Sequence, residues 1–95
     1  MINFEWDPAK ARANLAKHGV PFEIAQEVWA DPLHIILPDR VEEGEQRWHA
    51  VGIVGPVAIL VVVHTYPVAP DETRIRIIGA RKATRHERRR YEEGE

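Results

Sequence analysis

Residues 47–65, RWHAVGIVGPVAILVVVHT, contain two apolar runs on either side of Gly55-Pro56, and this segment decides the fold. A Gly-Pro pair between such runs marks a tight connection between two strands. The second run, from Val57 to Thr65, is almost entirely apolar and rich in β-branched residues, which is typical of a central strand covered on both faces. The segment therefore predicts two strands, over 47–54 and 57–65, at the centre of a sheet.

Further strands are predicted on both sides of this pair. Leu33 to Leu37 is apolar enough for a strand, and Asp39 to Gln46 is expected to form an exposed acidic turn after it. Downstream, a loop from Tyr66 to Glu72 leads to Thr73–Gly79, where apolar residues alternate with arginines, as in a strand with one buried face. Together these strands predict an antiparallel four-strand meander.

The first third of the chain predicts a short strand followed by two helices. The strand spans Ile2 to Trp6, and Asp7-Pro8 then supplies an N-cap and a proline at the first helical position, where proline is favoured. The first helix runs to His18. The second, from Pro21 to Ala30, ends at Asp31-Pro32 because the residue before a proline is pushed out of the helical region.

The chain closes with a basic helix. Thr84 followed by Glu87 is a capping-box pattern, which predicts the start of this helix. The arginines that follow leave it without a hydrophobic stripe, so we expect it to lie outside the core. We therefore predict a single domain over 1–95 of the α+β class: a short N-terminal strand, two helices, an antiparallel four-strand meander and a C-terminal basic helix.

Composition limits the class of protein. The 95 residues include no cysteine, which excludes disulfides, thiolate metal sites and a cysteine nucleophile. Charged residues follow Met1 almost at once, so no signal peptide is predicted. The apolar run from Val57 to Val63 is far shorter than the roughly 20 residues that cross a bilayer. These features predict a cytoplasmic protein without membrane contact.

The net charge of −2 hides an uneven distribution. Residues 1–72 hold 5 Lys or Arg and 11 Asp or Glu, a balance of −6, whereas residues 73–95 hold 8 and 4, a balance of +4. Most of the late cations are arginines, which favour planar two-point contacts to phosphate. The alternative interpretation is that these arginines form a solvent-exposed helix face and pair with nearby glutamates. The density of cations in this segment favours phosphate binding instead. The cations are Arg74, Arg76, Arg81, Lys82, Arg85, Arg88, Arg89 and Arg90.

Further candidates lie in the central strands. Arg47 and His49 share one face of their predicted strand, where they could orient and protonate a phosphate, while Trp48 points to the other face. His64 lies near the end of the most buried strand, a position that often lines a site. The alternatives are an edge strand that faces water and, for His64, a structural hydrogen bond. The spacing of the histidines predicts no metal site.

For an enzyme acting on nucleic acid, these residue types suit metal-free cleavage of RNA. The 2′-hydroxyl is the internal nucleophile, cations stabilise the charge on the phosphate oxygens, and an aromatic side chain stacks a base. A histidine can move the protons. The sequence has neither an apparent paired-carboxylate metal site nor a nucleotide-binding motif, so no cofactor is expected.

Three segments resemble the BrnT family of bacterial type II toxins. They are FEWDPAKARANLAKHGVPFEIA (4–25), RWHAVGIV (47–54) and IIGARKATRHERRRYEE (77–93), and they cover nearly the whole chain in order. The first contains the specific pattern W-D-x-x-K-x-x-x-N-x-x-K-H-G. The last contains A-R-K-A-T-x-x-E-R-R-x-Y, a second independent match.

The resemblance implies a RelE-like fold and the activity of a growth-inhibiting ribonuclease. It also implies that a BrnA-like antitoxin neutralises the protein. Contact with DNA is then expected only indirectly, through that antitoxin. By position, the resemblance implies functional roles for Arg47, Arg81 and Arg88, with Lys82, Arg85 and Tyr91 added. With the residue-based candidates, the predicted catalytic set is Arg47, Arg81, Arg88, Tyr91 and His64, and the predicted RNA-binding set is Lys82, Arg85, Arg89, Trp48 and His49.

Two other functions remain open on sequence grounds. The basic helix could serve a binding module that docks nucleic acid or an acidic protein without breaking a bond. A RelE-like toxin fold could also act on a target other than RNA, such as gyrase. Cleavage of RNA under EDTA separates the predicted ribonuclease from the binding module, and DNA supercoiling assays address the gyrase alternative.

Overall fold

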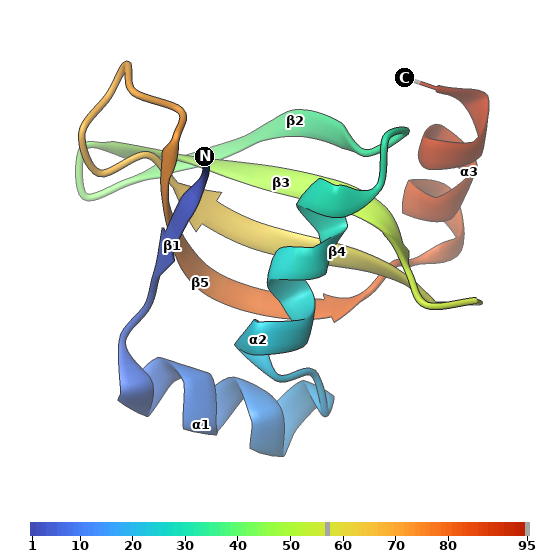
Figure 1. Cartoon of the computed structure of the whole chain (residues 1–95), viewed down its shortest axis with the longest axis horizontal. Helices are drawn as coiled ribbons and strands as arrows, with labels where there is room; N and C mark the ends of the chain where they lie inside the picture. Colours follow the sequence, from blue (N-terminus) through green and yellow to red (C-terminus); the bar gives the residue numbers. More distant parts are fainter. Residues whose placement is uncertain (57, 95) are drawn as a thin grey trace.

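The computed structural model describes residues 1–56 and 58–94 and is an α+β domain, which confirms the predicted fold class (Figure 1). Helices α1 and α2 follow the first strand, and α3 closes the chain. The elements are β1 (Asn3–Glu5), α1 (Pro8–His18), α2 (Phe22–Ala25), the 3₁₀ helix η1 (Gln26–Ala30), β2 (Ile35–Glu42), β3 (Glu45–Val54), β4 (Ala58–Thr65), β5 (Arg74–Lys82) and α3 (Arg85–Glu93).

The strands form one mixed sheet in the order β1-β5-β4-β3-β2. Strands β2 to β5 run antiparallel to their neighbours in chain order. β1 pairs with β5 in parallel, and Phe4 lies opposite Ile75. Strand β4, which starts at Ala58, is buried on both faces as predicted, since both Val61 and Val62 are fully buried. Val57, which the sequence assigned to this strand, lies outside the described residues.

The acidic turn predicted over 39–46 is wrong in extent. Strand β2 continues through Glu42 and β3 already begins at Glu45, so only Glu43 and Gly44 form the turn. Both turn residues have positive φ, 51° and 77°, as a two-residue hairpin that follows the twist of the strands requires. The pairing of β2 with β3 therefore outweighs the polar composition that suggested a loop.

The second predicted helix is also corrected. It is α-helical only in α2 and then tightens into the 3₁₀ helix η1. Its buried residues Phe22, Ala25 and Val28 are at most 1% exposed and recur every three residues. A 3₁₀ helix has three residues per turn, so the tightening keeps Val28 aligned with the others against the sheet.

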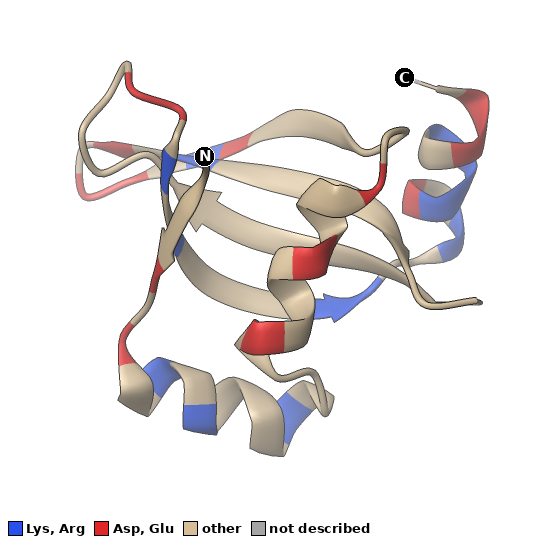
Figure 2. Cartoon of the chain, viewed as in Figure 1, with Lys and Arg blue, Asp and Glu red and all other residues tan. Residues whose placement is uncertain are grey.

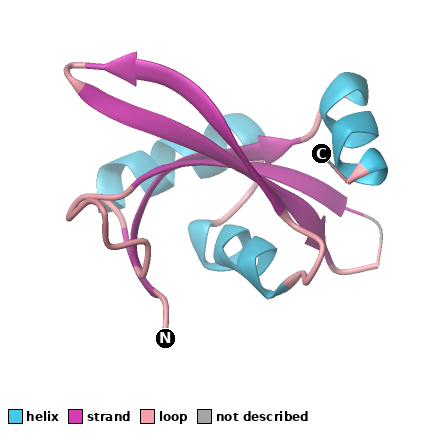
Figure 3. Ribbon diagram, turned by 90° about the horizontal axis from the view of Figure 1, so that it is seen from above, coloured by secondary structure: helices cyan, strands magenta, loops and turns pink. Residues whose placement is uncertain are grey.

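Helices lie on both sides of the sheet. Figure 3 shows α2 and α3 on opposite sides, and α2 with η1 covers the core. The first helix is fixed to the sheet by Asn14, whose side chain donates to the carbonyls of Val20 (3.0 Å) and Ala80 (2.9 Å) and accepts from the Ala80 N–H (3.0 Å). The asparagine of the N-terminal motif is thus a structural link. Among the described helices, none is long and apolar enough to span a membrane.

Candidate functional site

Helix α3 is attached to the domain at both of its ends. At its start, the Thr84 hydroxyl accepts from the Glu87 N–H and Glu87 accepts from the Thr84 N–H, which completes the predicted capping box. Near its end, the Tyr91 hydroxyl donates to Asp31 Oδ2 at 2.6 Å. Because the same Asp31 oxygen accepts from the Ile53 N–H at 2.8 Å, the end of the helix is tied to β3.

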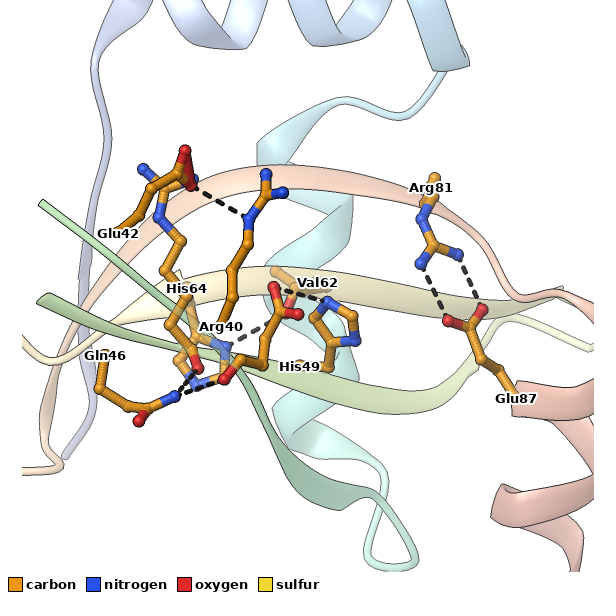
Figure 4. A network of polar contacts seen from close by, with 10 residues as sticks. Arg40, Glu42, Gln46, His49, Val62, His64, Arg81 and Glu87 are labelled. Carbon is orange, nitrogen blue, oxygen red and sulfur yellow. Dashed lines mark hydrogen bonds and ion pairs between the residues drawn. The ribbon is translucent and has the colours of Figure 1, made fainter.

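Arg81, at the end of β5, forms a two-point ion pair with Glu87 of α3. The distances are 2.7 Å from Nη1 to Oε1 and 2.9 Å from Nη2 to Oε2 (Figure 4). The hydrogen bonds from Arg81 lower the pKa of Glu87 to about 2, and the hydrogen bonds to Glu87 raise the pKa of Arg81. The pairing is made through the end of the guanidinium, so the edge formed by Nε–H and the second Nη2–H can take another acceptor.

His49 of β3 pairs with a carboxylate of β2. Its Nε2 lies 3.2 Å from Asp39 Oδ2, and both side chains retain 20–29% exposure. Glu87 is the main cause of the raised pKa of Arg81, and the negative charge of Asp39 lies close enough to raise it further. The imidazole and the Arg81–Glu87 pair lie on the same face of the sheet, and Figure 4 shows them as neighbouring but separate contacts.

Arg47 lies one same-face position before His49 on β3. Its Nη1 contacts Glu42 Oε2 at 3.0 Å, and Arg40 contacts the same oxygen at 3.2 Å. The buried Nε of Arg47 has no hydrogen-bond partner within residues 1–56 and 58–94. An unsatisfied buried donor is costly, so Arg47 has capacity for a further acceptor.

A groove of about 310 Å³ separates α3 from the sheet. It brings His49 next to Glu87, to His86, which the sequence left unassigned, and to Arg90, one of the cations of the basic segment. Apolar residues of β2 and β3 form its floor. The lining comprises Leu37, Pro38, His49, Val51, His86, Glu87 and Arg90.

The remaining predicted cations divide between two places. Lys82 and Arg88 line a second hollow beside α3, with Ala58 and Ile59, while Arg85 and Arg89 are exposed on the same helix. Figure 2 shows these cations gathered on α3 and at the end of β5. Arg74 and Arg76 instead pair with Glu5 at 3.1 Å and 3.0 Å, at the β1 edge, and stand apart from the groove.

Three predicted site residues do not join this cluster. His64 is fully buried on the core side of the sheet, where burial lowers its pKa to about 4. Trp48 pairs with His64 across the strands, so it shares that side and not the side of His49. Tyr91 is engaged with Asp31, and that hydrogen bond raises its pKa to about 12, which makes it a poor proton donor.

Sequence reasoning missed Asp39, His86 and Arg90 as neighbours of His49. Asp39 was placed in a turn, where no strand partner is defined, and only the register of β2 against β3 brings it to the imidazole. The signal for His86 and Arg90 was their four-residue spacing, which puts them on one face of a helix. Among residues 1–56 and 58–94, no group of three or more histidines and acids is arranged to hold a metal ion.

The domain is thus a small α+β protein whose cations gather on α3 and the end of β5, beside a histidine paired with a carboxylate. A family model described as the ribonuclease toxin BrnT of type II toxin–antitoxin systems matches residues 6–87, and the chain belongs to this family of ribonucleases. The 1.1 Å crystal structure of the Brucella abortus ribonuclease toxin BrnT is similar, with 25% identity and a TM-score of 0.67 over 88% of this chain and 99% of that chain. No curated protein matches the sequence.

Proposed function

We propose that the groove between α3 and the sheet is the site of a metal-independent RNA endonuclease. The observation that carries the proposal is the His49–Asp39 pair, because it places a proton-transfer group on the same face of the sheet as Arg81, within reach of the Asp39 charge. Membership in a family of ribonuclease toxins supports RNA as the substrate.

In the proposed reaction, the 2′-hydroxyl of the RNA attacks the adjacent phosphorus. His49 takes the hydroxyl proton, Asp39 fixes the orientation of the imidazole, and Arg81 and Arg47 stabilise the charge on the phosphate oxygens. The bond from phosphorus to the 5′-oxygen breaks and that oxygen takes a proton from water, while His49 returns its proton to the solvent, which leaves a 2′,3′-cyclic phosphate and a 5′-hydroxyl. Arg88, Lys82, Arg85 and Arg89 hold the phosphates of the flanking strand.

The test is cleavage of a defined RNA in EDTA, with product ends identified by mass spectrometry. We expect cyclic phosphate and 5′-hydroxyl ends. His49→Ala and Arg81→Ala should each lower the rate by at least about 100-fold, as loss of a proton-transfer group or a charge-stabilising donor does. Arg74→Ala is the matched control, because it removes an arginine paired with Glu5. Full activity in both the His49 and the Arg81 variant, or intact RNA at excess protein, overturns the proposal.

The type II family implies an antitoxin partner. We further propose that this partner is BrnA-like and covers α3, so that the complex loses affinity for RNA. The cationic surface of α3 supports this, since an acidic segment of a partner would be attracted to it. RNA binding measured with and without the antitoxin tests the idea, and equal affinity contradicts it. Because the chain belongs to the BrnT family, we also propose that its fold is RelE-like and that it acts in the cytoplasm.

A further inference from the structure

A further pocket, of about 380 Å³, lies at the opposite end of the sheet from α3. It is formed between the β2–β3 hairpin and the loop that joins β4 to β5 (Figure 1). Its walls are apolar where Trp48, Tyr66, Ala69 and Pro70 face it. Unlike the groove beside α3, it contains no Lys or Arg among its described lining residues.

The aromatic wall of this pocket consists of Trp48 and Tyr66, and Tyr66 packs on the buried His64. The centroids of Trp48 and Tyr66 lie 6.0 Å apart with their planes at 59°. The Tyr66 ring packs edge-to-face on His64, and its hydroxyl lies 3.3 Å from His64 Nε2. Since His64 is fully buried, it gives the Tyr66 ring a packed support within the domain.

The rim of the pocket carries carboxylates. Glu45 and Glu72 line it, and both residues are exposed. Neither carboxylate has a hydrogen bond or ion pair within the described part of the chain. Burial and the nearby charge of Glu72 both raise the pKa of Tyr66, which places that carboxylate near the phenol.

This combination selects a cation. A guanidinium or ammonium over the faces of Trp and Tyr gains a cation–π attraction, and free carboxylates at the rim add to it. The same carboxylates repel RNA phosphates. An aromatic wall without an acidic rim would suit a stacked base, but here the charge opposes that occupant.

We infer that this pocket receives a lysine or arginine side chain of the antitoxin. The inference rests on the antitoxin partner that the family implies, and it is independent of the RNA groove. The molecule is about 30 Å across, so roughly nine residues of extended antitoxin chain span the distance from α3 to this pocket.

The first test is the affinity of the purified toxin for its cognate antitoxin by calorimetry. Glu45→Lys and Glu72→Lys should each weaken binding by about tenfold, the scale of a lost cation–π contact and its charge attraction. Glu23→Lys, on the exposed side of α2, makes the same charge change elsewhere and should bind as the wild type does. Wild-type affinity in both pocket variants, or an equal loss in the control, overturns the inference.

RNA cleavage by the same variants separates this inference from the proposed function. Glu45→Lys and Glu72→Lys should cleave RNA at the wild-type rate, since neither residue lines the groove beside α3. If the wild type itself does not cleave, the ribonuclease proposal fails while the binding result still stands.

The second test identifies the ligand chemistry directly. In ¹⁵N-correlated spectra, N-acetyl-arginine amide or N-acetyl-lysine amide should shift the Trp48 indole N–H, and N-acetyl-glutamate amide should not. Glu72→Lys should abolish the shift. A short RNA that shifts this indole where the cationic amides do not would show that the pocket stacks a base, and would overturn the inference.

Discussion

Arg81 and Glu87 join the end of β5 to the first turn of α3 through two hydrogen bonds, of 2.7 Å and 2.9 Å. Glu87 also accepts from the Thr84 N–H, so one carboxylate both caps the helix and holds the arginine. The pair therefore fixes where α3 lies relative to the sheet, and so fixes one wall of the groove. It also holds the guanidinium that we assign to the phosphate.

Glu87→Gln is expected to lower the free energy of unfolding by roughly 1–2 kcal/mol near neutral pH, after allowance for the partial exposure of the pair. The folded pKa of Glu87, about 2, lies below its ordinary 4.5, so the carboxylate stabilises the fold above pH 4.5. That contribution is lost as the pH falls from 4.5 toward 2. Urea unfolding at several pH values measures it.

Glu92→Gln is the control for this prediction, because it neutralises an exposed acid of the same helix. It should leave the midpoint of unfolding nearly unchanged. If Glu87→Gln unfolds at the wild-type urea concentration both at pH 7 and at pH 3, the ion pair contributes nothing to stability.

His64 should behave as a neutral core residue. Its folded pKa, about 4, lies below the ordinary 6.5, since burial disfavours the charged ring. Below pH 6.5 the unfolded chain binds a proton that the folded chain does not, so this residue lowers stability progressively from pH 6.5 to about 4. NMR titration of the His64 ring should show its midpoint near 4. A midpoint above 6 would contradict the assignment.

Features that nearby residues specify, and the antiparallel order of β2 to β5, were predicted, whereas the pairing of β1 with β5 was not. The caps at Asp7 and Thr84 and the double-sided burial of β4 follow from nearby residues, and the structure has them. The parallel placement of β1 beside β5 depends on contacts about 70 residues apart, which no local pattern encodes.

The site shows the same division. Arg47, His49 and Arg81 were selected by residue type and resemblance, and the structure gathers them on one side of the sheet. Asp39 was missed because its role depends on register. His64 was selected for its place at a strand end, but the alternation of side chains turns it into the core, which sequence could not reveal without knowing the covered faces.

Tyr91→Phe should loosen the end of α3. The variant removes the donor to Asp31 at 2.6 Å, which we expect to cost roughly 1–2 kcal/mol of stability because the acceptor is charged. Amide exchange within α3 should become faster, and more so than exchange in β4. Unchanged protection of the helix would show that this hydrogen bond does not hold it.

The same variant also tests the raised pKa of Tyr91. The pKa of Tyr91, about 12, lies above the ordinary 10.0, so stability from this group is present below pH 10 and is lost as the pH rises toward 12. Absorbance at the tyrosinate band should show wild-type ionisation near pH 12 that disappears in Tyr91→Phe. A wild-type phenol that titrates fully by pH 10 would refute this.

Gly52→Ala should destabilise the packing of η1 on β3. A Cβ at this position would lie 2.9 Å from Val28 Cγ1, 3.1 Å from His34 Cβ and 3.2 Å from Asp31 Oδ2. Because the neighbours are buried or held by hydrogen bonds, we expect a loss of ~1–3 kcal/mol in thermal or urea unfolding. Gly79→Ala is a milder companion, since its Cβ would meet Asn14 Oδ1 at an ordinary 3.6 Å. Equal stability of both variants would show that Gly52 is not required for close approach.

Asp39→Asn tests how the proposed catalytic histidine is positioned. The Asp39 carboxylate lies 3.2 Å from His49 Nε2, and an amide in its place would hold the ring less firmly. We expect kcat for RNA cleavage to fall about tenfold or more with KM little changed, because the phosphate-binding arginines remain. Glu42→Gln is the matched control; it alters the carboxylate beside Arg47 and should raise KM more than it lowers kcat. If Asp39→Asn changes KM alone, the carboxylate serves binding and His49 needs no positioning partner.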